Sequence, residues 1–168
     1  AHWPDEPSHV TSALMVLDYI TSGVGEHPMR FAETYYVHYP KVAIGVWPPF
    51  YYLIAAIWML IFGASNISLL VLSGVFTAAL VSLVALLAWR MFGDPFVAIL
   101  LGLLLLALPE IQFSSSLFML DIPVALFQIL ALMCLIEYFR TERLSYAVYF
   151  ALVTSVAMLT KGNAIALI

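Results

Sequence analysis

Four long apolar runs make up most of the chain beyond residue 66. They cover residues 67–89, 95–113, 122–139 and 144–160. A helix needs about 20 apolar residues to cross the hydrocarbon core of a bilayer, and each run is long enough, the last only just. No Asp, Glu, Lys, Arg or His lies between Trp47 and Trp89. The pattern predicts four transmembrane helices in an all-α, polytopic bundle.

Residues 1–47 are polar, aromatic and rich in proline, and they hold all four histidines. One stretch carries apolar residues at helical spacing, at Val10, Ala13, Leu14, Leu17 and Ile20. Asp5, Glu6 and Pro7 precede it, and acidic residues and proline are favoured where a helix begins. We expect this helix to end within residues 21–25. A second short helix is expected over residues 29–37, and both should lie as amphipathic helices against the outer membrane face.

Residues 48–62 begin with two prolines and are apolar throughout, yet the segment is short. Residues 49–62 would extend about 21 Å as a helix at about 1.5 Å per residue, less than the hydrocarbon core of about 30 Å. We therefore expect a membrane-embedded helix that does not cross. The chain then divides into residues 1–65, a non-cytoplasmic first loop that includes this helix, and residues 66–168, the four transmembrane helices.

Basic residues in two turns predict the orientation of the bundle. Arg90 lies between the first and second long runs, and residues 140–143 lie between the third and fourth. Two crossings separate these turns, so they share a side, which the positive-inside rule makes cytoplasmic. Asp121 and Lys161 must then face outward.

The location of the polar first segment depends on residues 49–62. If they do not cross the membrane, residues 1–47 lie on the same side as Asp121. If they do cross, the bilayer separates the two. Their short length and paired prolines favour the first topology.

The composition agrees with a membrane protein. Apolar residues make up 64% of the chain and charged residues 10%, with a mean hydropathy of +1.04, whereas a soluble domain is about 25% charged. The net charge of −4 comes largely from the first forty residues, which does not suggest nucleic acid binding. The lone Cys134 excludes an internal disulfide. We expect the sequence to be an N-terminal fragment, an internal piece of a longer polytopic protein.

The predicted topology brings many charged residues to one membrane face. They are Asp5, Glu6, Glu26, Arg30, Glu33, His38, Lys41, Asp121 and Lys161. Carboxylates beside an apolar surface can act as a general base or hold a metal or a sugar. A lysine at the end of a crossing helix can hold a phosphate head group. Together these groups suit a reaction on a lipid-linked phosphate at the outer surface.

Four short motifs occur in order along the chain. They are Pro4-Asp5-Glu6, then Trp47-Pro48-Pro49-Phe50-Tyr51-Tyr52 with Phe62-Gly63, then Leu120-Asp121-Ile122-Pro123, and Leu159-Thr160-Lys161-Gly162. In this order and spacing the chain resembles the membrane-embedded GT-C glycosyltransferases, particularly the protein O-mannosyltransferase and lipid A aminoarabinose transferase group. The resemblance implies a sugar donor linked to polyprenyl phosphate and a lipid or protein acceptor. It also implies inverting transfer on the non-cytoplasmic face, here the outer face of a bacterial inner membrane.

The resemblance also implies roles for individual residues. Asp5 would be the catalytic base for the acceptor hydroxyl, and Asp121, in the second acidic motif, would line the same cavity as a second catalytic carboxylate. Glu6 would position acceptor or donor, and Lys161 would contact the donor phosphate.

The chain departs from the family at one motif. Some relatives carry Glu-Lys just before the proline of the proline-containing helix, where this chain has Val46-Trp47. We therefore expect Lys41 and His38 to serve instead in binding the donor head group.

Simpler interpretations exist for the same residues. Asp5, Glu6 and Asp121 are all placed where acidic side chains stabilise a helix start. Lys161 is placed where a lysine can extend its ammonium to the membrane surface. The aromatic residues around the paired prolines are typical of an interfacial belt.

A metal site and other functions remain alternatives. The four histidines near Glu26 and Glu33 suggest a zinc site, but they lack tight ligand spacing, so no residue is assigned to a metal and a divalent cofactor stays open. A transporter or flippase of lipid-linked intermediates would place charges along a pathway in mid-helix, whereas here they cluster at helix ends. A non-catalytic membrane subunit or an interfacial structural protein would need none of these roles.

Overall fold

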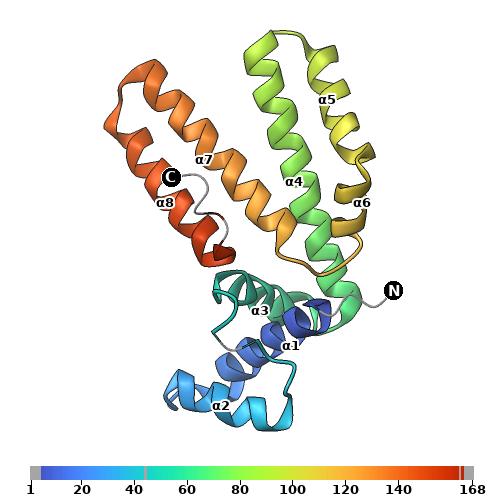
Figure 1. The fold of residues 1–168 in the computed structure, drawn as a ribbon, viewed down its shortest axis with the longest axis vertical. Coiled ribbons are helices and arrows are strands. Elements are labelled where there is room, and N and C mark those ends of the chain that lie inside the picture. The colour runs from blue at the N-terminus through green and yellow to red at the C-terminus, as the bar shows by residue number, and fades with distance from the viewer. Residues whose placement is uncertain (1–4, 44, 163, 165–168) are drawn as a thin grey trace.

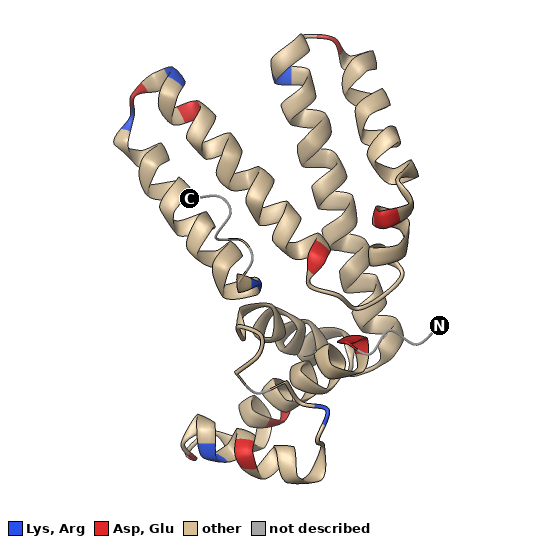
Figure 2. Ribbon diagram, viewed as in Figure 1, with Lys and Arg blue, Asp and Glu red and all other residues tan. Residues whose placement is uncertain are grey.

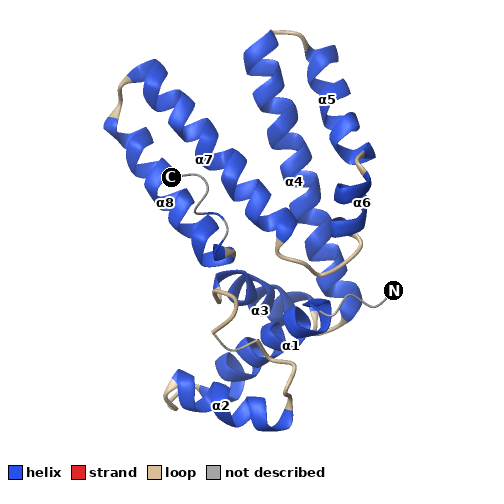
Figure 3. Ribbon diagram, viewed as in Figure 1, coloured by secondary structure: helices blue, strands red, loops and turns tan. Residues whose placement is uncertain are grey.

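The computed structural model describes residues 5–43, 45–162 and 164, and these residues form helices and loops without a β-strand (Figures 1 and 3). The polar first part contains α1 (Asp5–Asp18), a π-helix (Tyr19–Gly23) and α2 (Pro28–His38). The apolar part contains α3 (Phe50–Phe62), α4 (Asn66–Phe92), α5 (Pro95–Ala107), α6 (Pro109–Ser115), α7 (Asp121–Thr141) and α8 (Leu144–Thr160). The all-α fold expected from the sequence is confirmed.

The molecule has two parts that meet at one end of a helical bundle. Helices α4, α5, α7 and α8 run side by side, with α4 packed against both α5 and α7, and α7 packed against α8 (Figure 1). Helix α3 lies across one end of this bundle, where it contacts α1, α4 and α8. Helix α2 lies farther from the bundle, beyond α1 (Figure 1). The tyrosine-rich α3 therefore does not run alongside the long helices.

Two helices are long and apolar enough to cross a membrane. They are α4, with 27 residues, and α7, with 21. Helices α5 and α6 pass the same test together but are bent by 67°. Helices α3 and α8 are apolar but shorter, with 13 and 17 residues. Among the residues described, two helices, or three if α5 and α6 form one span, are thus long enough, and the four crossings stay a prediction.

The break between α5 and α6 divides a run that the sequence predicted as one helix. Leu108 adopts an extended conformation, with φ −65° and ψ 126°. Proline disfavours a helical conformation in the residue before it and has no N–H to continue the hydrogen-bond ladder. Pro109 therefore ends α5 and begins α6 in a new direction.

The first helix also differs from its predicted bounds. Asp5 and Glu6 form the first turn of α1 rather than preceding it. After Asp18 the helix widens into a π-helix over Tyr19–Gly23. The hydroxyls of Thr21 and Ser22 donate to the Asp18 carbonyl at 3.3 and 2.8 Å, and such local bonds compete with the regular α-helical ladder.

Charged residues of the bundle lie near the helix ends, as Figure 2 shows. At the end remote from α3, Glu137 accepts hydrogen bonds from Arg90 at 3.1 Å and from Arg140 at 3.2 Å. Because Arg90 lies in the last turn of α4 and Arg140 in the last turn of α7, the two basic turns lie at the same end of the bundle. The opposite end carries the start of α7 and the close of α8.

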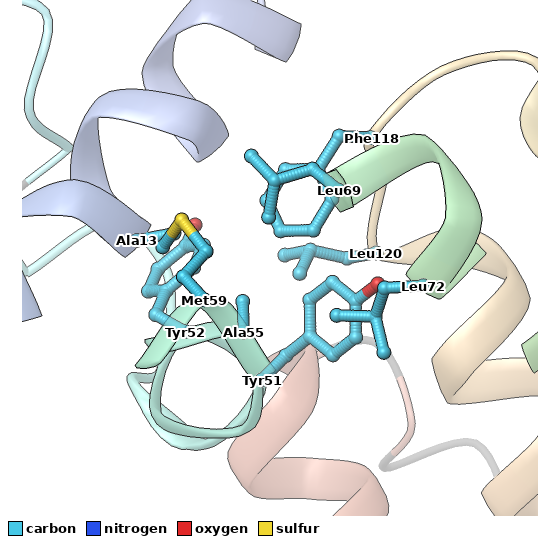
Figure 4. Close-up of a cluster of buried hydrophobic side chains, with 9 residues drawn as sticks. All are labelled: Ala13, Tyr51, Tyr52, Ala55, Met59, Leu69, Leu72, Phe118 and Leu120. Carbon is cyan, nitrogen blue, oxygen red and sulfur yellow. The ribbon is translucent and has the colours of Figure 1, made fainter. Parts of the chain in front are cut away.

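A buried aromatic cluster joins the two parts (Figure 4). It contains Ala13 of α1, Tyr51, Tyr52, Ala55 and Met59 of α3, Leu69 and Leu72 of α4, and Phe118 and Leu120 of the loop before α7. The Tyr51 ring stacks on the Phe118 ring, with centroids 5.2 Å apart. Burial of these rings fixes α1 and α3 against the loop that leads into α7.

Truncating Phe118 should loosen this junction. We expect Phe118→Ala to lower the free energy of unfolding by about 3 kcal/mol, because a fully buried aromatic ring is replaced by a cavity. Unfolding of the protein in mixed micelles by increasing sodium dodecyl sulfate measures the change. Phe96→Ala, at a ring that is 71% exposed on α5, is the matched control and should change stability by less than about 0.5 kcal/mol. Equal losses in the two variants would contradict the prediction.

Candidate functional site

An ion pair lies at the end of the bundle that faces α3. Helix α7 begins at Asp121, and Lys161 follows the last residue of the antiparallel α8. The Lys161 Nζ donates to Asp121 Oδ1 at 2.6 Å, with the Asp121 side chain 44% exposed and that of Lys161 18% exposed. A partly exposed pair contributes about 1 kcal/mol or less to stability. Its chemical importance lies in presenting an ammonium and a carboxylate together.

Trp47 brings the first part of the chain against this ion pair. The Lys161 Nζ lies 5.6 Å from the centroid of the Trp47 ring, a cation–π contact. The Trp47 ring also lies 5.6 Å from the His9 ring, centroid to centroid. Trp47 comes directly before the prolines that lead into α3, so this segment is fixed between α1 and the close of α8.

His9 is the buried residue beside Trp47 and the Asp121–Lys161 pair. Its side chain is 2% exposed, and its Nδ1 lies 2.8 Å from the Tyr52 hydroxyl. Burial lowers the pKa of His9, since the imidazolium would lose its hydration. The negative charges of Asp5 and Asp121 oppose this lowering of the pKa, and the positive charge of Lys161 adds to it. Burial therefore favours the neutral form of His9.

Asp5 lies close to the same cluster. It is four residues before His9 in α1, so the two side chains occupy one face of the helix. Asp5 is exposed, and its charge acts on His9 together with those of Asp121 and Lys161. The structure thus brings the first and second acidic motifs to the same end of the bundle.

Glu6 contacts the loop that leads to the second acidic motif. Its Oε1 accepts the backbone N–H of Phe118 at 3.2 Å, although the two residues are 112 apart in the sequence. Because Phe118 lies three residues before Asp121, this bond ties the first turn of α1 to the start of α7.

Lys41 and His38 differ in their placement. Lys41 lines a groove of about 460 Å³ together with Glu6, Asn66 and Ser116, so it lies on the side of α1 that carries Glu6. His38 ends α2, is exposed, and its Nδ1 contacts the Thr34 carbonyl of the same helix at 3.0 Å. The structure brings Lys41 near the acidic pair but leaves His38 on α2, outside the Asp121–Lys161 cluster.

A larger cavity of about 490 Å³ lies between α1, α2 and the segment before α3. Its walls are almost entirely apolar and include Met15, Val16, Phe31, Ala32 and Val46. Trp47 and Tyr52 also line it, and these two side chains contact Lys161 and His9, respectively.

The histidines do not form a metal site in the described part of the chain. No group of three or more His, Cys, Asp or Glu side chains there is arranged to hold a metal ion. His9 has aromatic neighbours, while His27 and His38 are exposed. His2 lies outside the described residues. The zinc alternative thus has no supporting geometry among the residues that can be placed.

The sequence did not single out His9 or Trp47 as members of the site. His9 was one of four histidines considered for zinc, and Trp47 was assigned to an aromatic belt. The four-residue spacing of Asp5 and His9 was an available signal, because residues so spaced share a helix face. The contact between Trp47 and Lys161 joins segments more than a hundred residues apart, and no local pattern predicts it.

These features define an α-helical integral membrane protein with an acid–cation cluster at one end of its bundle. The chain belongs to the dolichyl-phosphate-mannose-protein mannosyltransferase family, whose model matches residues 46–168. The matched region contains Trp47, Asp121 and Lys161, and the match confirms the resemblance to GT-C glycosyltransferases. Comparison with curated proteins and with solved structures found no significant match.

Membership of this family indicates a mannosyltransferase-type glycosyltransferase. It also implies that the protein is embedded in a membrane and uses a lipid-linked sugar donor. Both implications agree with the apolar helices α4 and α7.

The buried His9 should make stability depend on pH. Its pKa lies below the ordinary value of 6.5 in the folded protein. As the pH falls below about 6.5, the unfolded chain binds a proton that the folded protein resists, so stability falls with pH. We expect the melting temperature of the purified protein to fall between pH 7.5 and 5.5.

The control for this effect is His9→Gln, which keeps a polar group opposite the Tyr52 hydroxyl but does not titrate. Its melting temperature should fall less over the same pH range. A slope equal to that of the unchanged protein would show that other groups carry the pH dependence.

Proposed function

We propose that this protein transfers a sugar from a polyprenyl-phosphate donor to a lipid or protein acceptor on the non-cytoplasmic face of the membrane. The observation that carries the proposal is the meeting of α1, which bears Asp5, with the Asp121–Lys161 pair at one bundle end. A carboxylate and an ammonium at the edge of an apolar bundle match the needs of glycosyl transfer from a lipid phosphate.

The reaction needs a base on one side of the anomeric carbon and a cation on the other. The exposed Asp5 carboxylate accepts the proton of the acceptor hydroxyl, and the hydroxyl oxygen forms a bond to the anomeric carbon. The bond from that carbon to the phosphate oxygen breaks, and the polyprenyl phosphate leaves with its electron pair. Attack opposite the leaving group inverts the configuration.

In this proposal, Lys161 stabilises the leaving phosphate. Its ammonium can bind phosphate oxygens as a point charge, while Asp121 Oδ1 and the Trp47 ring hold it on two sides. Asp121 thereby orients the cation and, with 44% of its side chain exposed, can also contact the sugar. Lys41, in the groove beside Glu6, is a second cation on this part of the molecule.

The orientation follows from the two ends of the bundle. Arg90 and Arg140 lie together at the end remote from α3, and basic turns favour the cytoplasmic side. The Asp121–Lys161 end then faces outward, which in a bacterial inner membrane is the outer face of that membrane. Helix α3, about 20 Å long at about 1.5 Å per residue, lies across this end as an embedded helix rather than a crossing.

The positions of the charges favour a transferase over a transporter. A pathway for a polar head group through the bilayer needs charged or polar residues along the middle of the helices. In the described α4, α5, α7 and α8, the charged residues are Arg90, Asp121, Glu137 and Arg140, all near helix ends. If the protein were instead a non-catalytic subunit with this fold, replacing Asp5 would leave its function unchanged.

Replacing Asp5 tests the proposed catalytic base. We expect Asp5→Asn to lower kcat by about 100-fold or more, because the amide cannot accept the proton, while donor binding is kept. Transfer of radiolabelled mannose from polyprenyl-phosphate mannose is measured in membranes that carry the native acceptors but no other copy of the enzyme.

Glu33→Gln is the control, because it removes an exposed carboxylate from α2 in the same polar part. Its transfer rate should match that of the unchanged protein. Full activity in Asp5→Asn would support the non-catalytic subunit and reject Asp5 as the base.

Replacing Lys161 tests the phosphate contact. We expect Lys161→Gln to raise the KM for the donor by about tenfold or more, since the charge on the phosphate loses its partner. Lys161→Arg keeps a cation with a different shape and should recover part of the affinity. An unchanged donor KM in Lys161→Gln would place the phosphate elsewhere.

A further inference from the structure

Glu6 uses its side chain to bind the protein's own backbone. Its Oε1 accepts the N–H of Phe118 at 3.2 Å, whereas the neighbouring Asp5 is exposed to solvent. Neighbouring residues on a helix project about 100° apart at 3.6 residues per turn, so the pair faces two directions. Asp5 lies on the face of His9, and Glu6 lies on the face of the loop before α7.

The loop that Glu6 holds is buried at alternate positions. Phe118 is 1% exposed and Leu120 is fully buried, and both belong to the aromatic cluster with Tyr51. A loop packed in this way must satisfy its backbone polar groups, because an unpaired buried amide is costly. The Glu6 side chain supplies the acceptor oxygen for the Phe118 amide, at 3.2 Å.

The contact between Glu6 and Phe118 lies close to Asp121, so a small shift of this loop would move the Asp121 carboxylate. Asp121 follows Leu120 directly and begins α7, and its Oδ1 is 2.6 Å from Lys161 Nζ. The first turn of α1 carries both Asp5 and the carboxylate that fixes this loop. The hydrogen bond from the Phe118 amide to Glu6 therefore links the first acidic motif directly to the loop before the second.

We propose that Glu6 is a positioning residue, which holds the loop of residues 116–120 so that Asp121 and Lys161 keep their place opposite Asp5. It acts through its reach and its acceptor oxygen, and its negative charge is not required by the substrate. The effect on activity rests on the proposed glycosyl transfer, while the contact with the loop stands independently of it.

Three substitutions separate reach from charge. Glu6→Gln keeps the length of the side chain and an acceptor oxygen but loses the charge. Glu6→Asp keeps the charge but is one methylene shorter, and Glu6→Ala removes both. Glu33→Ala is the matched control, at an exposed carboxylate of α2.

The first measurement is hydrogen–deuterium exchange of the peptide that covers residues 114–120, in the full-length protein in nanodiscs. We expect exchange of the Phe118 amide to be about tenfold faster or more in Glu6→Ala and Glu6→Asp, because the amide loses its acceptor. Glu6→Gln and Glu33→Ala should exchange within about twofold of the unchanged protein. Unchanged exchange in both Glu6→Ala and Glu6→Asp would overturn the proposal.

The second measurement is transfer from polyprenyl-phosphate mannose. We expect kcat to fall about tenfold or more in Glu6→Asp, with the donor KM nearly unchanged, and to stay within about threefold in Glu6→Gln. The opposite order, with Glu6→Asp active and Glu6→Gln inactive, would show that substrate needs the charge and would overturn the proposal. Because Glu6→Asp keeps a carboxylate at the helix start, it serves as the test even if Glu6→Ala does not fold.

The two readouts also separate this proposal from the proposed function. If the unchanged protein transfers no sugar while exchange follows the expected order, the glycosyl transfer is wrong and the loop contact stands. If the unchanged protein transfers sugar but the exchange order fails, the contact is wrong and the transferase stands.

Discussion

The free-energy cost of placing a charged side chain in the hydrocarbon core determines where this protein carries its charges. A charged side chain in the bilayer core is costly unless it is paired or reaches water, and the described long helices keep their charged residues near their ends. The consequence is two polar ends with different chemistry. Arg90, Glu137 and Arg140 share one end, and Asp121 and Lys161 share the other.

The second end becomes a site because the polar first part of the chain packs onto it. Helix α3 has 13 residues and is shorter than the hydrocarbon core of about 30 Å. It lies across the end of the bundle, where its aromatic face is buried. The stacked rings of Tyr51 and Phe118 fix it there. This packing delivers Trp47 to the Lys161 ammonium and α1, with its acidic first turn, to the start of α7.

Much of the fold could be predicted from hydrophobic periodicity, and the limits of that prediction are physical. The apolar runs that became α4 and α7 are long and contain few charged residues, so length and hydropathy identify them. The run that became α5 and α6 contains Pro109, and its effect on the preceding residue breaks the helix. Pro109 is a helix-breaking signal of the same kind as the paired prolines before α3, so the break could have been predicted from the sequence.

The candidate site could be predicted only in part, because its members meet through packing. The order of the motifs identified Asp5, Asp121 and Lys161 as candidate site residues, and the predicted topology put all three on one face of the membrane. The ring contact of His9 with Trp47 and the bond from the Phe118 amide to Glu6 join segments far apart in the sequence, so they depend on how the helices pack. His38 lies on α2, where its Nδ1 contacts the Thr34 carbonyl, and its expected role in binding the donor head group stays a prediction.

The acidic pair at the start of α1 shows how two similar side chains acquire different tasks. Asp5 and Glu6 are adjacent and carry the same charge, so composition alone cannot distinguish them. The helix turns the exposed Asp5 toward the face of His9, and it turns Glu6 toward a buried backbone amide. A base must be free to meet a hydroxyl, whereas a residue that fixes a loop must already be engaged. The direction that each side chain takes from the helix, rather than its charge, thus separates a chemical role from a positioning role.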